Sequence, residues 1–124
     1  MSASDLALTL VEVAARAADE KGGEDLVALD VSSRLPLADA FLLVTGRNER
    51  NVLAIADEVE DKLLEAGAKP LRREGRSEGR WVLLDFGELL VHIFHEQDRL
   101  YYGLERLWQD CPVIRLPEFE PSTD

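Results

Sequence analysis

A chain of 124 residues, 46% of them hydrophobic, is long enough to fold as one domain around a single core and too short for two. Its 25 acidic and 14 basic residues give a formal net charge of −11, which excludes a protein that wraps nucleic acid with its whole surface and favours a basic partner. One cysteine excludes an internal disulfide, and the lack of a secretion signal or of an apolar run of about 18 residues predicts a soluble, cytoplasmic protein.

The N-terminal part of the chain predicts a helix followed by two strands. Apolar residues recur at helical spacing after Ser4, which is suited to cap the helix, and Gly22 ends the pattern. The compact apolar runs 25–31 and 39–46 predict strands, with Gly46 closing the second. Because both runs are too apolar for a one-sided sheet, we expect them to lie centrally, covered on two faces.

A second amphipathic helix is expected after Asn48, which is a suitable N-cap. Its apolar stripe continues to Leu63, and the sequence AGAKP at 66–70 ends it. Asp57 and Asp61 point away from the stripe, which indicates a solvated acidic face.

Three strands are predicted next: a short basic segment at 70–75, the stretch GRWVLLDFG at 79–87 and the run ELLVHIF at 88–94, with a tight hairpin at 85–88. Side chains alternate between the two faces of a strand with a period of two. The stretch 79–87 therefore has two faces: Val82, Leu84 and Phe86 on one, and Trp81, Leu83 and Asp85 on the other.

A third helix is predicted from about Asp98 to Cys111, with Tyr102 nearly opposite an apolar side formed by Leu100, Leu104, Leu107 and Trp108. We expect a single domain at 1–113 and an acidic, loosely ordered tail at 114–124. The fold class is α+β, a mixed and roughly five-stranded sheet flanked by helices.

The sequence contains no complete catalytic motif. His92 and His95 would lie on opposite faces of a strand, so we expect no metal site; His92 is interpreted as a sheet residue satisfied by a neighbour, and His95 as a loop residue. The strand, glycine turn and helix around Gly46 resemble a nucleotidyltransferase, but Asp30 and Asp85 each lack the second carboxylate that holds magnesium. We expect no catalytic residue and no cofactor, and a nucleotide-binding enzyme of that type stays as the alternative.

The basic segment has two interpretations. Five bases fall within residues 69–80, namely Lys69, Arg72, Arg73, Arg76 and Arg80. Charge on an exposed edge strand prevents unwanted pairing with other strands. Alternatively, Arg72, Arg73 and Arg76 contact an RNA backbone, and the sequence favours neither interpretation.

The face shared by Trp81, Leu83 and Asp85 is a candidate protein-binding surface. An ionised carboxylate is rarely buried without a partner, so Asp85 should bring this face toward solvent or toward a cation. The outward Tyr102, with Glu105 beside it, would extend an arrangement typical of binding hot spots. The alternative is that a helix of the same chain covers Trp81. An exposed apolar patch of this kind could also pair two copies in a homodimer.

Three stretches together resemble the Iojap family, the bacterial ribosomal silencing factors, over roughly residues 5–113: DAFLLVTGRNERNVLAIADEVE, EGRSEGRWVLLDFGELLVHIF and YYGLERLWQD. The resemblance implies a fold similar to nucleotidyltransferases without their catalytic carboxylates. It also implies a non-enzymatic factor that docks on universal protein fourteen of the large ribosomal subunit and prevents the small subunit from joining, with a further role in large-subunit maturation. The family's docking residues fall on Trp81, Asp85 and Tyr102. Gly103 departs from the larger residue common in the family.

Overall fold

The fold is a six-stranded mixed sheet with two long helices on one face. The computed structural model describes residues 3–34, 38–102, 106 and 110–116. The elements in chain order are α1 (Asp5–Glu20), β1 (Glu24–Asp30), β2 (Ala40–Gly46), α2 (Glu49–Glu65), β3 (Arg72–Glu74), β4 (Trp81–Asp85), β5 (Leu89–His95), α3 (Glu96–Tyr102) and β6 (Val113–Ile114).

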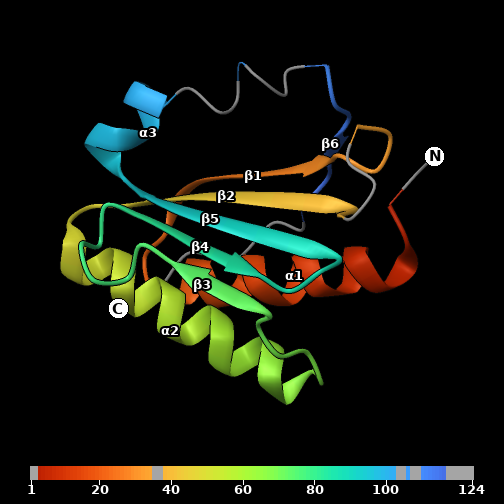
Figure 1. The fold of residues 1–124 in the computed structure, drawn as a ribbon, viewed down its shortest axis with the longest axis horizontal. Helices are drawn as coiled ribbons and strands as arrows, with labels where there is room; N and C mark the ends of the chain where they lie inside the picture. The colour runs from red at the N-terminus through yellow and green to blue at the C-terminus, as the bar shows by residue number, and fades with distance from the viewer. Residues whose placement is uncertain (1–2, 35–37, 103–105, 107–109, 117–124) are drawn as a thin grey trace.

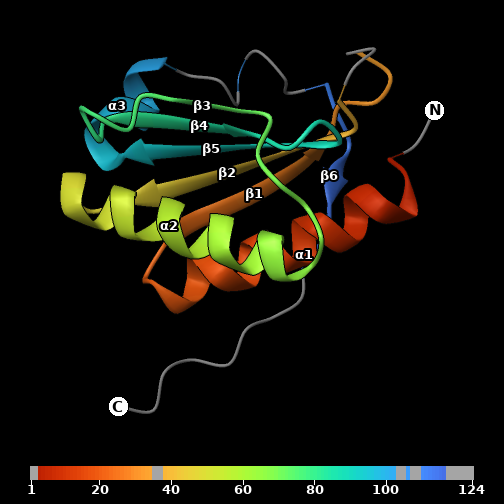
Figure 2. The same ribbon diagram turned by 60° about the horizontal axis from the view of Figure 1, so that its bottom comes forward.

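The strand order is β3-β4-β5-β2-β1-β6. Among the strands that the structure describes, only β2 and β5 pair in parallel, and the other neighbours are antiparallel. The helices α1 and α2 lie side by side under the sheet, whereas α3 projects from the end of β5 on the other side (Figure 1; Figure 2). The prediction of an α+β fold with a mixed sheet flanked by helices is confirmed.

The helix ends follow the local signals in the sequence. Ser4 caps α1 by accepting a hydrogen bond from the Ala7 N–H, and Asn48 caps α2 by accepting one from the Asn51 N–H. The predicted apolar stripe of α2 is buried as far as Leu63. None of the helices that the structure describes is long and apolar enough to cross a membrane.

Two apolar clusters occupy the two faces of the sheet. The larger joins the sheet to α1 and α2; its fully buried side chains include Val11, Leu42, Ile55, Leu63, Leu84 and Ile93. The smaller lies on the opposite face and consists of Leu29, Val31, Ala38, Phe41, Leu43, Phe94 and Cys111. Trp81 packs against the smaller cluster while staying partly exposed.

Strand β6 corrects the expected strand number from five to six. Val113 and Ile114 pair with Leu29 and Ala28 of β1, so the sheet continues one strand beyond β1. A strand of two residues is too short to produce a periodic pattern, so it could not be predicted from the sequence. The central position predicted for both early strands holds fully for β2, whose residues are all buried, but β1 begins with exposed residues.

The structure corrects two expectations for the C-terminal part of the chain. The third helix begins at Glu96 rather than Asp98. His95 is the buried last residue of β5 rather than a loop residue, and its N–H donates to the carbonyl of Arg80 over 2.8 Å. Some predicted features lie outside the described residues: the side chain of Tyr102, the residues Gly103 and Glu105, and the tail from 117 onward.

Candidate protein-binding surface

The alternation predicted for β4 is present in the structure. Val82 and Leu84 are fully buried on the side of α1 and α2. Trp81, Leu83 and Asp85 are partly exposed on the other side. The three predicted residues of β4 are therefore brought together on the face of the sheet opposite the two long helices.

Neighbouring strands extend this face in register. Trp81 lies beside Phe94 of β5, and Leu83 lies between His92 of β5 and Glu74 of β3. Cross-strand neighbours of this kind are close enough for their side chains to contact each other. The surface is thus a continuation of the smaller apolar cluster toward the exposed edge of the sheet.

Trp81 is held by two neighbouring rings. Its indole stacks on Phe94, with ring centroids 5.2 Å apart and an interplanar angle of 28°. The indole N–H donates to Nδ1 of His92 over 3.2 Å. A partly exposed aromatic ring with fixed neighbours is a suitable anchor for a partner, because little side-chain freedom is lost on binding.

Asp85 already has partners in its own chain. Its Oδ1 accepts the N–H of Gly87 over 2.8 Å, which closes the hairpin between β4 and β5. Its Oδ2 lies 3.6 Å from Nη2 of Arg72. The cation expected near this carboxylate is therefore Arg72 of β3.

Arg80 connects three elements at the end of the sheet where Trp81 lies. Its Nη2 lies 2.6 Å from Oδ1 of Asp98 in α3, and its Nη1 lies 3.0 Å from Oε1 of Glu49 in α2. These hydrogen bonds, first that to Asp98, raise the pKa of Arg80. The pKa of Glu49 is lowered, first by a hydrogen bond from its own backbone N–H and then by Arg80. The described part of α3, Glu96–Tyr102, therefore begins beside the start of β4.

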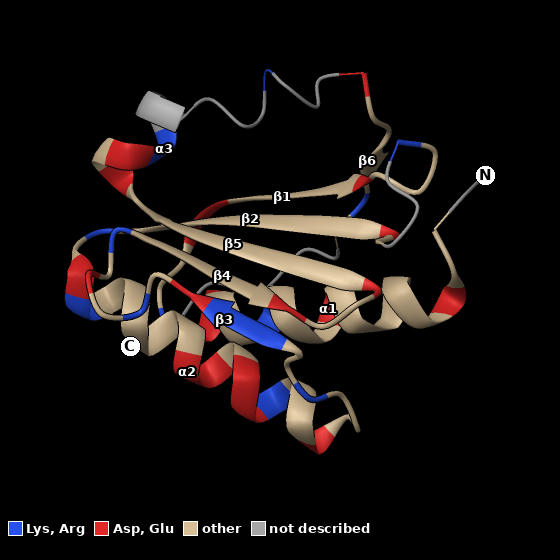
Figure 3. Ribbon diagram, viewed as in Figure 1, with Lys and Arg blue, Asp and Glu red and all other residues tan. Residues whose placement is uncertain are grey.

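The three arginines considered for an RNA contact all pair with acids. Arg73 pairs with Glu60, and Arg76 lies 2.6 Å from Asp57 and 3.5 Å from Glu60. Arg72 pairs with Asp85, as described above. In Figure 3 the blue strand β3 runs beside the red acidic positions of α2. These contacts favour the interpretation as a charged edge strand.

The turn around Gly46 is shaped by packing. A Cβ added to Gly46 would lie 2.6 Å from Cγ2 of Val52, so the glycine lets α2 approach β2 closely. The side chain of Asn51 accepts the Arg47 N–H over 3.0 Å and donates to the Lys21 carbonyl over 2.9 Å. Within the described part of the chain, no three His, Cys, Asp or Glu residues form a group that could hold a metal ion.

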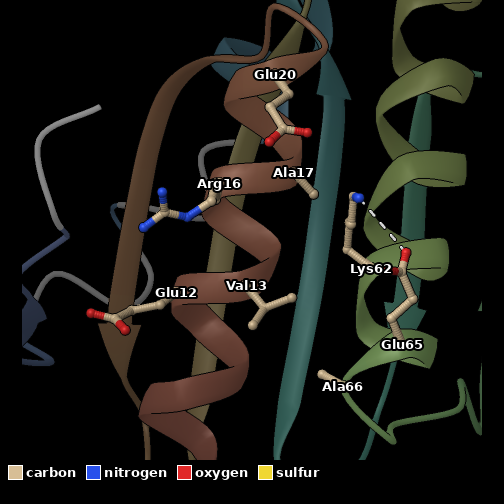
Figure 4. A pocket seen from close by; sticks show the side chains of 8 residues that line it. All are labelled: Glu12, Val13, Arg16, Ala17, Glu20, Lys62, Glu65 and Ala66. Atoms are coloured by element: carbon tan, nitrogen blue, oxygen red, sulfur yellow. Dashed lines mark ion pairs between the residues drawn. The ribbon is translucent and has the colours of Figure 1, made fainter. Parts of the chain in front are cut away.

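A separate groove of about 490 Å³ lies between α1 and α2 (Figure 4). Val13 and Ala17 line it from α1, and Lys62 and Glu65 line it from α2, with Nζ of Lys62 3.7 Å from the Glu65 carboxylate. It faces away from Trp81, because α1 and α2 lie on the other side of the sheet.

The sequence placed Arg80 only in the basic segment and did not indicate its ion pairs with Glu49 and Asp98 or the Trp81–His92 pair. His92 was expected to be satisfied by a neighbour, which is correct for Nδ1, but nothing local identified Trp81 as that neighbour. The only available signal was the hairpin: counting outward from a turn at Gly87 and Glu88 pairs Leu83 with His92 and places Trp81 two residues along β4, on the same face.

Comparisons with known proteins identify relatives of this chain. A family model described as "Ribosomal silencing factor during starvation" matches residues 4–124. "Ribosomal silencing factor RsfS" of Bacillus subtilis is 43% identical over 108 residues, covering 87% of this chain and 92% of the relative. "Protein Iojap, chloroplastic" of Zea mays is 29% identical over 106 residues, covering 83% of this chain and 45% of the relative.

Two solved structures share the fold. A crystal structure of a protein from Bacillus halodurans has a TM-score of 0.77 and 40% sequence identity, covering 87% of this chain and 98% of that chain. An X-ray structure of a protein from Chromobacterium violaceum has a TM-score of 0.79 and 33% identity, covering 92% of each chain.

Proposed function

This chain belongs to the family of ribosomal silencing factors, and from that premise we propose that it binds the large ribosomal subunit through the face of Trp81, Leu83 and Asp85. The contact on the subunit is its universal protein fourteen, as the resemblance to the family implies. With the factor bound, its body occupies the space that the small subunit needs in order to join. Translation is repressed by occlusion, which requires no chemical step and no cofactor.

The observation that carries this proposal is the state of Trp81. Its ring is partly exposed, yet it is stacked on Phe94 and hydrogen-bonded to His92. Hot spots of protein interfaces are enriched in such aromatic residues, surrounded by polar groups that exclude water. Leu83 supplies apolar area beside the indole, and Asp85 supplies a charge at the edge.

The charge of the chain fits a ribosomal partner. Ribosomal proteins are generally basic, and a net charge of −11 attracts a basic surface over a distance. This attraction mainly accelerates encounter and weakens as salt is added. Tyr102 and Glu105 are proposed to extend the same contact from the third helix, since Arg80 and Asp98 hold the start of α3 beside β4.

The test is light scattering of purified large and small subunits mixed with and without the protein. We expect the native chain to prevent the rise in scattering that accompanies joining. Trp81→Ala should lose this effect, because removing an aromatic anchor typically weakens binding by about thirtyfold or more. Leu64→Ala is a matched control, since Leu64 is an exposed apolar residue on α2.

A melting curve followed by circular dichroism accompanies each variant. Trp81→Ala should remain folded, because the side chain lies at the margin of the smaller cluster rather than inside it. If subunits join normally in the presence of excess native chain, the proposed function is wrong. If Trp81→Ala inhibits joining as well as the native chain does, the proposed surface is wrong.

A further inference from the structure

We propose that His92 is the positioning residue of this surface: it accepts the indole N–H of Trp81 and so presents the ring to the partner as an apolar surface without a free hydrogen-bond donor. This inference rests on the proposed function. It assigns a role to a residue that lies beneath the surface and does not itself reach the partner.

The geometry places His92 where it can fix the indole. Its side chain lies in β5 directly across from Leu83, on the same face as Trp81, and is only 6% exposed. Its Nδ1 lies 3.2 Å from Nε1 of Trp81. Phe41 contacts the imidazole edge-on, with ring centroids 4.9 Å apart, so the imidazole is itself held in place.

The direction of this hydrogen bond determines which nitrogen of the imidazole carries the proton. The indole nitrogen can only donate, so Nδ1 of His92 must carry a lone pair and the ring proton must be on Nε2. Burial lowers the pKa of His92 to about 4, so the imidazole stays neutral near pH 7 and keeps this lone pair.

The second imidazole nitrogen, Nε2, makes a histidine costly at this position. Nε2 is buried and has no hydrogen-bond partner in the described part of the chain. A buried donor without a partner is unfavourable, and a phenylalanine at the same position would avoid this penalty. The imidazole must therefore provide something that a phenylalanine ring does not. That contact is the hydrogen bond that Nδ1 accepts from Trp81.

The consequence concerns the chemistry of the partner. The indole N–H is already used inside the chain, and the ring stacks on Phe94, so the exposed part of Trp81 presents carbon atoms to a partner. We infer that the partner meets it with aliphatic side chains rather than with a hydrogen-bond acceptor.

The first experiment uses the unaltered chain. Nitrogen-15 NMR distinguishes the two imidazole nitrogens, and the resonance of the Trp81 indole N–H is assigned by its absence in Trp81→Phe. We expect an unprotonated Nδ1 on His92 and slow hydrogen exchange of the indole N–H. A proton on Nδ1, or an indole N–H that exchanges as fast as in an unfolded peptide, would overturn the proposal without any His92 variant.

The second experiment compares two substitutions. His92→Phe keeps an aromatic ring but removes the acceptor, whereas His92→Asn keeps an acceptor, Oδ1, near the position of Nδ1. We expect His92→Phe to exchange the indole N–H at least tenfold faster and to bind purified large subunits about tenfold more weakly. His92→Asn should recover most of both losses, which a purely structural role would not require.

The outcomes separate this inference from the proposed function. If the wild-type chain fails to bind large subunits, the proposed function is wrong. If the wild type binds and His92→Phe binds equally well, only the role of His92 is wrong. The same conclusion follows if His92→Asn protects the indole N–H but binds as weakly as His92→Phe.

Discussion

Arg72 and Asp85 lie directly opposite each other on β3 and β4, with Nη2 of Arg72 3.6 Å from Oδ2 of Asp85. The carboxylate proposed to meet a basic partner therefore already has a cation within its own chain. The arginine is more than half exposed, so this pair contributes little to folding and its partners can exchange. A ribosomal lysine or arginine would have to replace or share this contact.

Arg72→Gln distinguishes the two interpretations of this arginine. If Arg72 only pairs with Asp85, removing it frees the carboxylate, and binding to large subunits should stay within about threefold of the native value or become tighter. If Arg72 contacts an RNA phosphate, binding should weaken and depend less steeply on salt. Arg50→Gln, which removes the same charge at an exposed position of α2, is the control. Affinity is measured by sedimentation with large subunits at two salt concentrations.

Glu60 is predicted to hold the β3–β4 connection against α2. Its carboxylate pairs with both Arg73 and Arg76, and its side chain is only 14% exposed. Glu60→Gln should lower the free energy of unfolding by about 1 kcal/mol, with a smaller loss at high salt. Urea unfolding at low and high salt measures this loss. Asp61→Asn, an exposed acid on the same helix, should change stability little, and an equal loss in both variants would contradict the prediction.

Gly75 is predicted to be essential for the backbone next to Trp81. Its φ is +83°, and an added Cβ would lie 1.9 Å from the carbonyl oxygen of Trp81. Gly75→Ala should therefore cost at least about 2 kcal/mol of stability and shift the NMR resonance of the Trp81 indole. Gly67→Ala is the matched control, because Gly67 also has a positive φ but has no atom within 4 Å of the added Cβ. Thermal unfolding should show the larger loss in Gly75→Ala.

The elements that the sequence predicted well are those with local signals. The caps Ser4 and Asn48 lie immediately before α1 and α2, and the apolar stripe of α2 needs only its own spacing. The two faces of β4 follow from alternation alone. Such signals depend on residues a few positions apart, so they can be recognised without knowledge of the tertiary structure.

The contacts that the sequence did not predict join distant residues. Arg80 and Asp98 are 18 positions apart, and Arg99 donates from α3 to the Asp25 carbonyl across 74 positions. Strand β6 likewise depends on β1 for its pairing. The candidate surface could be predicted because its three β4 residues alternate within one strand, whereas the His92 contact proposed to orient Trp81 depends on the register of two strands.

The buried imidazole of His92 predicts a specific pH dependence of stability. Burial lowers its pKa from 6.5 to about 4. Between these two values the unfolded chain binds a proton that the folded chain does not, so stability falls as the pH falls from about 6.5 to about 4. The corresponding loss is up to about 3 kcal/mol for the full shift.

The measurement is the free energy of unfolding by urea from pH 7 to pH 4 for the wild type and His92→Asn. Burial raises the pKa of Asp30, but hydrogen bonds from Ser32 and Ala3 together lower it below its usual value. Such carboxylates titrate in both chains and cancel in the difference. The advantage of the wild type over His92→Asn should shrink steadily as the pH falls through this range. A difference that stays constant from pH 7 to pH 4 would mean that His92 titrates alike in the folded and unfolded chains, contrary to its burial between Phe41 and Phe94.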